Sequence, residues 1–70
     1  MDIEYDSEAD ALYIRFRQDK PVNSVDIEEG VTVDLDGQKH LVGVEILNAS
    51  RRLPSDALSA VTVRNLLTAA

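Results

Sequence analysis

Apolar and polar residues alternate along most of the first 47 positions, a period of two that is typical of strands with one buried face. The alternation is clearest from Leu12 to Phe16, where every second side chain is apolar and the intervening ones are polar or aromatic. The same pattern predicts five strands, at residues 2–6, 11–17, 23–28, 31–36 and 41–47.

The predicted strand at 41–47 differs from the others because it carries apolar side chains on both faces, such as Val42 on one and Leu47 on the other. A strand of this kind is usually central in its sheet, or lies beneath a helix or a partner chain. Gly43 predicts either a β-bulge or the close approach of another backbone at this point.

Residues that favour turns separate the predicted strands. Asp and Ser side chains at 6–10 bond readily to nearby backbone N–H groups. Pro21 has no N–H to donate within a sheet, and the pairs Glu29-Gly30 and Asp36-Gly37 are typical turn dipeptides.

The C-terminal third of the chain has a different pattern. Asn48 is suited to cap one helical turn over 48–53, which Pro54 then ends. Ser55 is suited to cap a second helix, whose apolar stripe would be formed by four residues. These are Leu58, Val61, Leu66 and Leu67. The β-branched run at 61–63 disfavours a helix, so a short strand there is the alternative.

These elements predict an α+β fold: a small twisted antiparallel β-sheet of four to five strands in a meander, with a C-terminal helix. We expect a single domain over 1–70, in which 1–50 form the sheet and 51–70 the helical segment. Helix and sheet would share one core, built from Ile3, Leu12, Ile14, Phe16, Val33, Val42, Val44, Ile46, Leu58 and Leu66.

Composition limits the possible functions. The chain has 70 residues and no cysteine, so a disulfide framework and a thiolate zinc site are excluded. A chain this short buries little surface by itself, and self-association is the usual remedy. Its net charge of −6 argues against general binding to nucleic acid backbones.

The charge is also divided along the sequence. Residues 1–36 hold 11 acids and 3 bases, or −8, whereas residues 37–70 hold 4 bases and 2 acids, or +2. Halves of opposite sign can attract each other within one chain or between two copies.

Two segments resemble a known family. Residues 5–14 read YDSEADALYI, and residues 33–37 (VDLDG) precede residues 41–50 (LVGVEILNAS). Both are similar to signatures of the DUF2283 family of small prokaryotic proteins of unknown function, and the resemblance covers about residues 3–50. It implies a compact antiparallel sheet with a helical C-terminus and no known activity. Family members are sometimes encoded beside small toxin-like proteins, which implies an antitoxin-like role and a toxin-like partner.

Asp6, Glu8 and Asp10 have the spacing of the first three ligands of a calcium-binding loop. However, Ala11 and Arg17 occupy the positions at which that loop needs a glycine and a bidentate glutamate. We therefore interpret the segment as an acidic turn, with a low-affinity cation contact as the alternative.

His40 is the only histidine of the chain, and no motif connects it to Ser50 or Asp34. A catalytic role would require a nucleophile and an orienting acid that converge on it. We expect no catalytic residue, no metal site and no cofactor.

The remaining candidates for a functional site are carboxylates and basic residues. Asp34, Asp36 and Glu45 would form a carboxylate site if the strand register placed Glu45 opposite the two aspartates. Glu45 would be half-buried and would need a cationic partner. The candidate partners are Arg15, Arg17 and Arg51.

Tyr13, Arg15 and Arg17 form an aromatic and basic side of the second strand, a combination that can stack on bases and bind phosphates. A second basic group is formed by Arg51, Arg52 and Arg64.

Together these observations favour a non-enzymatic protein-interaction module that acts as a homodimer, with an antitoxin-like role implied by the resemblance alone. One alternative is a small ligand-binding protein or enzyme with a carboxylate site at a dimer interface, and another is a nucleic-acid-binding regulator. The acidic N-terminus lacks the features of a secretion signal, and no apolar run is long enough to cross a membrane, so we expect a cytoplasmic protein.

Overall fold

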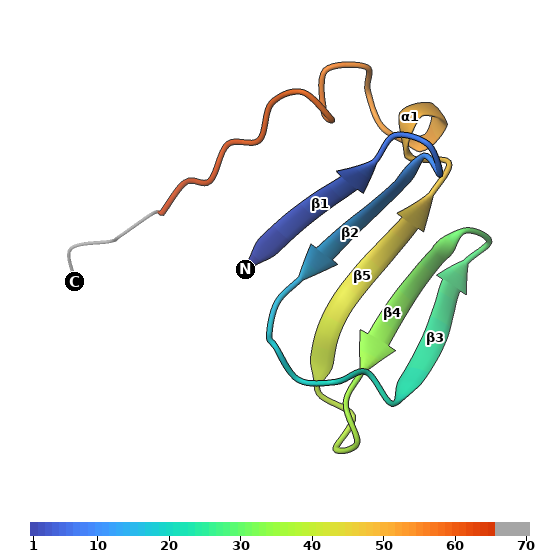
Figure 1. The fold of residues 1–70 in the computed structure, drawn as a ribbon, viewed down its shortest axis with the longest axis vertical. Coiled ribbons are helices and arrows are strands. Elements are labelled where there is room, and N and C mark those ends of the chain that lie inside the picture. Colours follow the sequence, from blue (N-terminus) through green and yellow to red (C-terminus); the bar gives the residue numbers. More distant parts are fainter. Residues whose placement is uncertain (66–70) are drawn as a thin grey trace.

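Residues 1–65 form one antiparallel sheet of five strands, followed by a single helical turn (Figure 1). The computed structural model describes residues 1–65. The elements are β1 (Asp2–Asp6), β2 (Ala11–Arg15), β3 (Asn23–Glu28), β4 (Val31–Leu35), β5 (Leu41–Leu47) and α1 (Ala49–Arg52). The five predicted strands are therefore confirmed, and β2 and β4 end one or two residues earlier than the alternation indicated.

The strand order is β1-β2-β5-β4-β3, so the prediction of a meander is wrong. β1 with β2 and β3 with β4 form two hairpins, and β5 is inserted between them (Figure 1). The connection from β2 to β3 therefore runs across the end of the sheet. β5 occupies the centre because its side chains are apolar on both faces, whereas the acidic β1 and β3 are left at the edges.

The strand register sorts the side chains onto two faces, because directly paired residues point to the same side of the sheet. One face is apolar, and we call it the apolar face. Its residues lie in two cross-strand rows: Ile3, Ile14, Val44, Val33 and Val25, then Tyr5, Leu12, Ile46 and Val31, with the charged Glu28 at the end of the second row because a register shift in β3 sets it opposite Val31. The other is the polar face, with the rows Asp2, Arg15, Gly43, Asp34 and Ser24, then Glu4, Tyr13, Glu45, Thr32 and Asp26.

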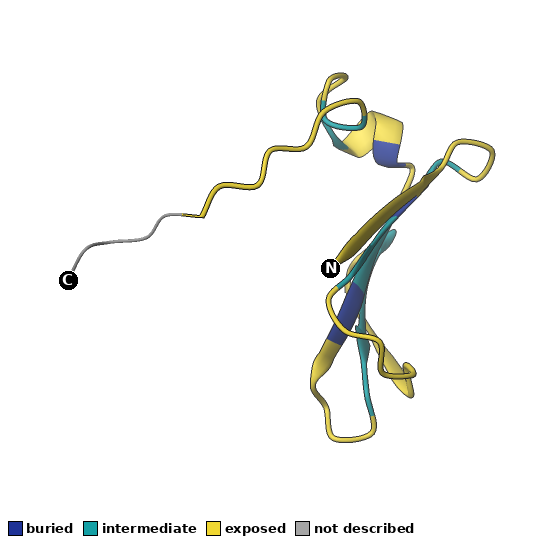
Figure 2. Ribbon diagram, turned by 60° about the vertical axis from the view of Figure 1, so that its left-hand side comes forward, coloured by how far each residue is buried: buried dark blue, intermediate teal, exposed yellow. Residues whose placement is uncertain are grey.

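Few residues are buried, because no second layer of helices or strands from residues 1–65 covers the sheet (Figure 2). Among the described residues, the buried apolar side chains are Leu12, Val42 and Ala49. The predicted core is wrong for Ile3 and Phe16, which are 40% and 43% exposed. Leu66, also placed in that core, lies outside the described residues. The other predicted core positions are half-buried: Ile14, Val33, Val44, Ile46 and Leu58.

The helical part of the chain is much smaller than predicted. α1 occupies the position expected for the first helical turn, although Asn48 precedes it in a left-handed conformation (φ 53°) and makes no side-chain capping bond. The predicted second helix is wrong within the described residues: 55–59 form turns, and 60–65 have neither helix nor strand. Pro54 and the β-branched residues at 61–63 explain why no helix continues. Leu67, the last residue of the predicted stripe, lies outside the described residues.

Within residues 1–65, no helix has the length and apolar character needed to span a membrane.

Candidate functional site

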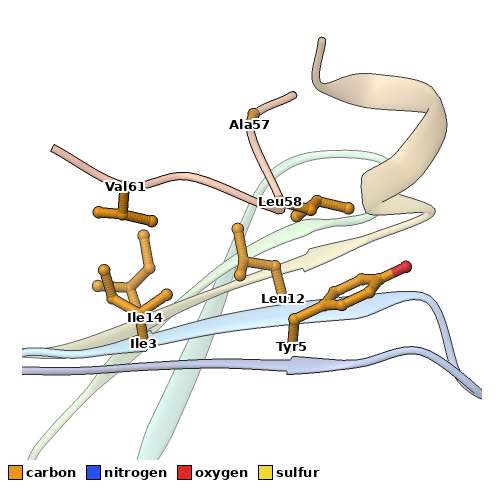
Figure 3. A pocket seen from close by; sticks show the side chains of 7 residues that line it. All are labelled: Ile3, Tyr5, Leu12, Ile14, Ala57, Leu58 and Val61. Atoms are coloured by element: carbon orange, nitrogen blue, oxygen red, sulfur yellow. The ribbon is translucent and has the colours of Figure 1, made fainter. Parts of the chain in front are cut away.

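The apolar face is only partly covered by the C-terminal segment, which we define as residues 54–65. Residues 57–61 of this segment lie over β1 and β2 and border a hollow of about 390 Å³ against them (Figure 3), and the chain then runs outward past β1 (Figure 1). The side chains around it are Ile3, Tyr5, Leu12, Ile14, Ala57, Leu58 and Val61. Leu58 and Val61 stand above the sheet, and the Tyr5 hydroxyl points away from the hollow (Figure 3). The side chains of β3, β4 and β5 are not among those lining this hollow.

A second hollow, of about 450 Å³, lies beside α1. It is bounded by Val31 and Ile46 of the apolar face and by Glu28, Arg52 and Leu53. Arg52 donates to the backbone carbonyl of Leu47 at 2.9 Å and to that of Glu29, and pairs with the Glu28 carboxylate at 3.3 Å. This predicted site residue therefore binds its own chain and holds the β3–β4 turn against α1.

Asp10 is the centre of a hydrogen-bonded group that joins the β1–β2 turn to α1, which we call the Asp10 cluster. Its carboxylate accepts from the Tyr5 hydroxyl at 2.7 Å, and from the backbone N–H and the hydroxyl of Ser50 at 3.0 and 2.7 Å. Its own carbonyl accepts from the N–H of Ala49 at 3.0 Å. The Tyr5 and Ser50 hydrogen bonds lower the pKa of Asp10, and the bond to Asp10 raises the pKa of Tyr5.

In the acidic turn at residues 6–10, carboxylate oxygens accept hydrogen bonds from backbone N–H groups. Asp6 Oδ1 accepts from the N–H groups of Glu8 and Ala9 at 3.0 and 3.2 Å, while Asp10 is held by Tyr5 and Ser50. In the described part of the chain, no three acidic or histidine side chains gather closely enough to hold a metal ion. The arrangement is that of a structural turn.

On the polar face, Tyr13 and Asp34 are linked across β5. The Tyr13 hydroxyl donates to Asp34 Oδ2 at 2.8 Å, and the Ser24 hydroxyl donates to Asp34 Oδ1 at 2.8 Å. The Tyr13 ring reaches across Gly43, where a side chain would collide with it. Burial and the hydrogen bond to Asp34 raise the pKa of Tyr13.

The predicted aromatic and basic side of β2 is only partly formed. The Arg15 guanidinium lies 5.2 Å from the centroid of the Tyr13 ring. Arg17 lies beyond the end of β2, where it pairs with Asp36 at 3.3 Å and Asp19 at 3.4 Å. The three side chains therefore do not form one surface.

The predicted carboxylate site is not assembled by the strand register. Glu45 lies opposite Tyr13 and Thr32, and Asp34 lies opposite Gly43, so the two acids are not paired. Within residues 1–65, Glu45 takes part in no ion pair, so it is bound by none of its three candidate partners, Arg15, Arg17 and Arg51.

Asp36 lies in the β4–β5 turn, away from the other two carboxylates. It accepts from the backbone N–H groups of Gln38 and His40 at 2.8 and 2.9 Å, and the His40 Nδ1 is 3.5 Å away. The hydrogen bond from the backbone N–H of His40 is the main cause of the lowered pKa of Asp36. His40 thus forms part of the β4–β5 turn and contacts Asp36.

Sequence reasoning missed the Asp10 cluster and the complete burial of Ala49. The pattern indicates Asp10 only as one acid of a solvated turn, and Ser50 only as a residue without a motif. The two lie 40 residues apart, and no periodicity in a single sequence connects them. The sequence feature that could have connected them is that Asp10 lies in one, and Ser50 in the other, of the two segments that resemble family signatures.

A family model described as "Protein of unknown function (DUF2283)" matches residues 2–50 of the 70-residue chain. The matched range includes all five strands and ends within α1. Comparison with curated proteins and with solved structures gives no significant match. The family suggested by the two sequence segments is therefore confirmed.

Proposed function

Since the chain belongs to the DUF2283 family, whose function is unknown, its own surfaces are the guide to its role, and we propose that it is a non-enzymatic protein-interaction module that acts as a homodimer. The observation that carries this proposal is the single-layer sheet, which leaves large apolar side chains in contact with solvent. Val25, Ile27 and Phe16 are 46%, 63% and 43% exposed. Of these, Val25 adjoins Val33 and Val44 in one cross-strand row, and exposed apolar side chains that adjoin one another in this way mark an interaction site.

The non-enzymatic part of the proposal rests on how the polar side chains are used. Asp10, Asp34 and Asp36 each accept hydrogen bonds that hold a turn or join strands. A catalytic group must instead face a cavity in which substrate binds. The two hollows described above are lined mainly by apolar residues and contain none of these aspartates.

The oligomeric state of the 70-residue chain tests the proposal directly. We expect sedimentation equilibrium to give a mass that rises with concentration from that of one chain toward that of two. The midpoint of thermal unfolding should rise with it, because association stabilises only the folded state. A mass of one chain at every concentration up to about 1 mM, where an association of only about 4 kcal/mol would be half complete, would contradict the homodimer.

The more specific roles remain predictions. An antitoxin-like role with a toxin-like partner follows only from the family resemblance. A carboxylate site at a dimer interface would require an interface on the polar face, where Glu45 lies. A nucleic-acid-binding role would require Tyr13 and Arg15, whose side chains lie together, to bind nucleic acid although the net charge of −6 repels its phosphates.

A further inference from the structure

We propose that the outer edge of β1 binds an extended segment of another protein, in which basic and apolar side chains alternate, as a sixth strand of the sheet. Among the described residues, β1 is bonded on one side only, to β2. Alternate residues of such an edge direct their backbone N–H and C=O groups outward, where a partner strand can bond to them. The partner is a different protein, so the inference stands whether or not the chain forms the proposed homodimer.

On the apolar face, the hollow beneath residues 57–61 opens toward this edge. Its wall on β1 is the exposed one, because Ile3 and Tyr5 are 40% and 38% exposed, whereas Leu12 of β2 is 9% exposed. Val61 stands above this part of the sheet (Figure 3) and is itself 61% exposed. A sixth strand would place every second side chain beside Ile3 and Tyr5 and beneath the C-terminal segment, and apolar side chains fit there.

On the polar face, the same edge is acidic, and this determines the charge of the partner. Asp2, Glu4 and Asp6 all point to this face. Within residues 1–65, none of the three takes part in an ion pair. Arg15, opposite Asp2, lies over a tyrosine ring of its own strand, and Arg64 pairs with no acid. Side chains of a sixth strand would lie about 5 Å from these acids, so lysine or arginine is favoured there and a second acidic strand is disfavoured.

The opposite edge of the sheet lacks this combination. The pairing of β3 with β4 is interrupted by a register shift between Asp26 and Glu28, and an irregular edge is a poor template for another strand. Glu28 also pairs with Arg52 at 3.3 Å, so its charge is already balanced. β1, in contrast, pairs with β2 in unbroken register from Asp2 to Asp6. Of the two edges, β1 is therefore the one that fits a basic partner strand.

Nuclear magnetic resonance of the isotope-labelled chain, titrated with short peptides, tests the inference. The probe is the peptide KVKVKVK with blocked ends, and the control is KKKKVVV, which has the same residues and charge without the alternation. We expect the probe to shift the amide signals of β1 and of residues 57–63, with a dissociation constant of about 0.1 mM, because the contact is small. The control should bind at least tenfold more weakly.

Two substitutions at opposite ends of one cross-strand row of the polar face locate the site. Glu4→Lys and Asp26→Lys change the net charge equally, but the first lies on β1 and the second on β3. We expect Glu4→Lys to weaken the binding of KVKVKVK at least tenfold, and Asp26→Lys to weaken it less than threefold. Circular dichroism checks that both variants fold.

Equal binding of the two peptides, equal effects of the two variants, or signal shifts centred on β3 would each overturn the inference. An absence of binding up to about 1 mM peptide, an affinity of only about 4 kcal/mol, would also overturn it. If the signals of β1 shift with the concentration of the chain alone, the edge binds a second copy instead of a basic partner. Sedimentation equilibrium without peptide tests the homodimer separately, so the failure of one proposal is distinguishable from the failure of the other.

Discussion

At the scale of single residues, Gly43 shows how closely the polar face is packed. A Cβ atom at this position would lie 2.8 Å from the carbonyl oxygen of Ile14 and would overlap the Tyr13 ring. The ring can therefore cross β5 and bring its hydroxyl to Asp34 only because position 43 has no side chain. The glycine is thus needed for space, at the centre of the sheet.

We expect Gly43→Ala to lower the free energy of unfolding by about 1–3 kcal/mol, because an added methyl group has no room here. Gly37→Ala is the matched control, since its Cβ would meet only the Val22 Cγ2 atom at 3.9 Å, an ordinary contact distance. Urea unfolding of both variants checks the prediction. Equal stability of the two would mean that Tyr13 moves aside without cost.

The sequence predicted either a β-bulge or the close approach of another backbone at Gly43, because a glycine among larger apolar residues in a strand often marks one of the two. It did not predict that Tyr13 makes the approach. Tyr13 and Gly43 become neighbours only because β5 pairs with β2, and that pairing depends on the strand order. Local patterns therefore identified the unusual residue but not its partner.

At the scale of elements, the Asp10 cluster joins the β1–β2 turn to α1. Asp10 itself has a left-handed backbone (φ 52°), which directs its carbonyl and carboxylate toward the first residues of the helical turn. A helix of four residues has little stability alone. Its position is therefore maintained by hydrogen bonds to Asp10 and by the buried Ala49.

Because of the Asp10 cluster, the stability of the fold depends on pH in the acidic range. The pKa of Asp10 is lowered in the folded protein from its ordinary value of 3.8, so its carboxylate stabilises the fold above that value and loses this effect as the pH falls through the folded pKa. We expect Asp10→Asn to melt at a lower temperature than wild type near pH 7 and to lose less stability on acidification to about pH 3, since asparagine does not titrate there.

Thermal melts followed by circular dichroism across this range provide the measurement. Glu8→Gln is the control, because it removes a charge from the same turn but none of the hydrogen bonds to Asp10. It should retain the acid dependence of wild type. If the stability of Asp10→Asn falls with pH as steeply as that of wild type, Asp10 is not the source of the pH dependence. Asp36, whose pKa is also lowered, is then the remaining candidate.

The elements differ in how far the sequence predicts them. Each strand was identified from alternation, which is a local property of about six residues. The strand order was predicted wrongly as a meander, since hairpin signals describe only neighbouring strands. The prediction of a second C-terminal helix was wrong. It relied on the helical spacing of the apolar residues Leu58 and Val61, but the β-branched residues at 61–63 favour extended backbone.

At the scale of the whole molecule, the two faces of the sheet have opposite characters. Almost every large side chain on one face is apolar, and the charges are placed on the other face, the edges and the turns. In a dimer formed through the apolar face, two chains of net charge −6 approach each other. Repulsion between them opposes the apolar contact.

We therefore expect salt to strengthen the dimer. Raising the ionic strength from about 0.01 M to about 1 M shortens the screening length from about 30 Å to about 3 Å, which removes most of the repulsion between the two copies. Sedimentation equilibrium should show a dissociation constant several-fold lower at high salt. A dissociation constant that rises with salt would indicate an interface held by ion pairs instead.

The position of β5 at the centre of the sheet also determines the order in which the protein folds. Each hairpin closes through nearby residues, on a timescale of about 1–10 μs, but an isolated pair of strands is barely stable in water. β5 is the last strand in the sequence, and it must pair with β2 across as many as 36 residues, from Ala11 to Leu47, before the two hairpins are joined. Cooperative folding therefore waits for residues 41–47, and until they dock, both hairpins expose apolar surface to any other chain they meet.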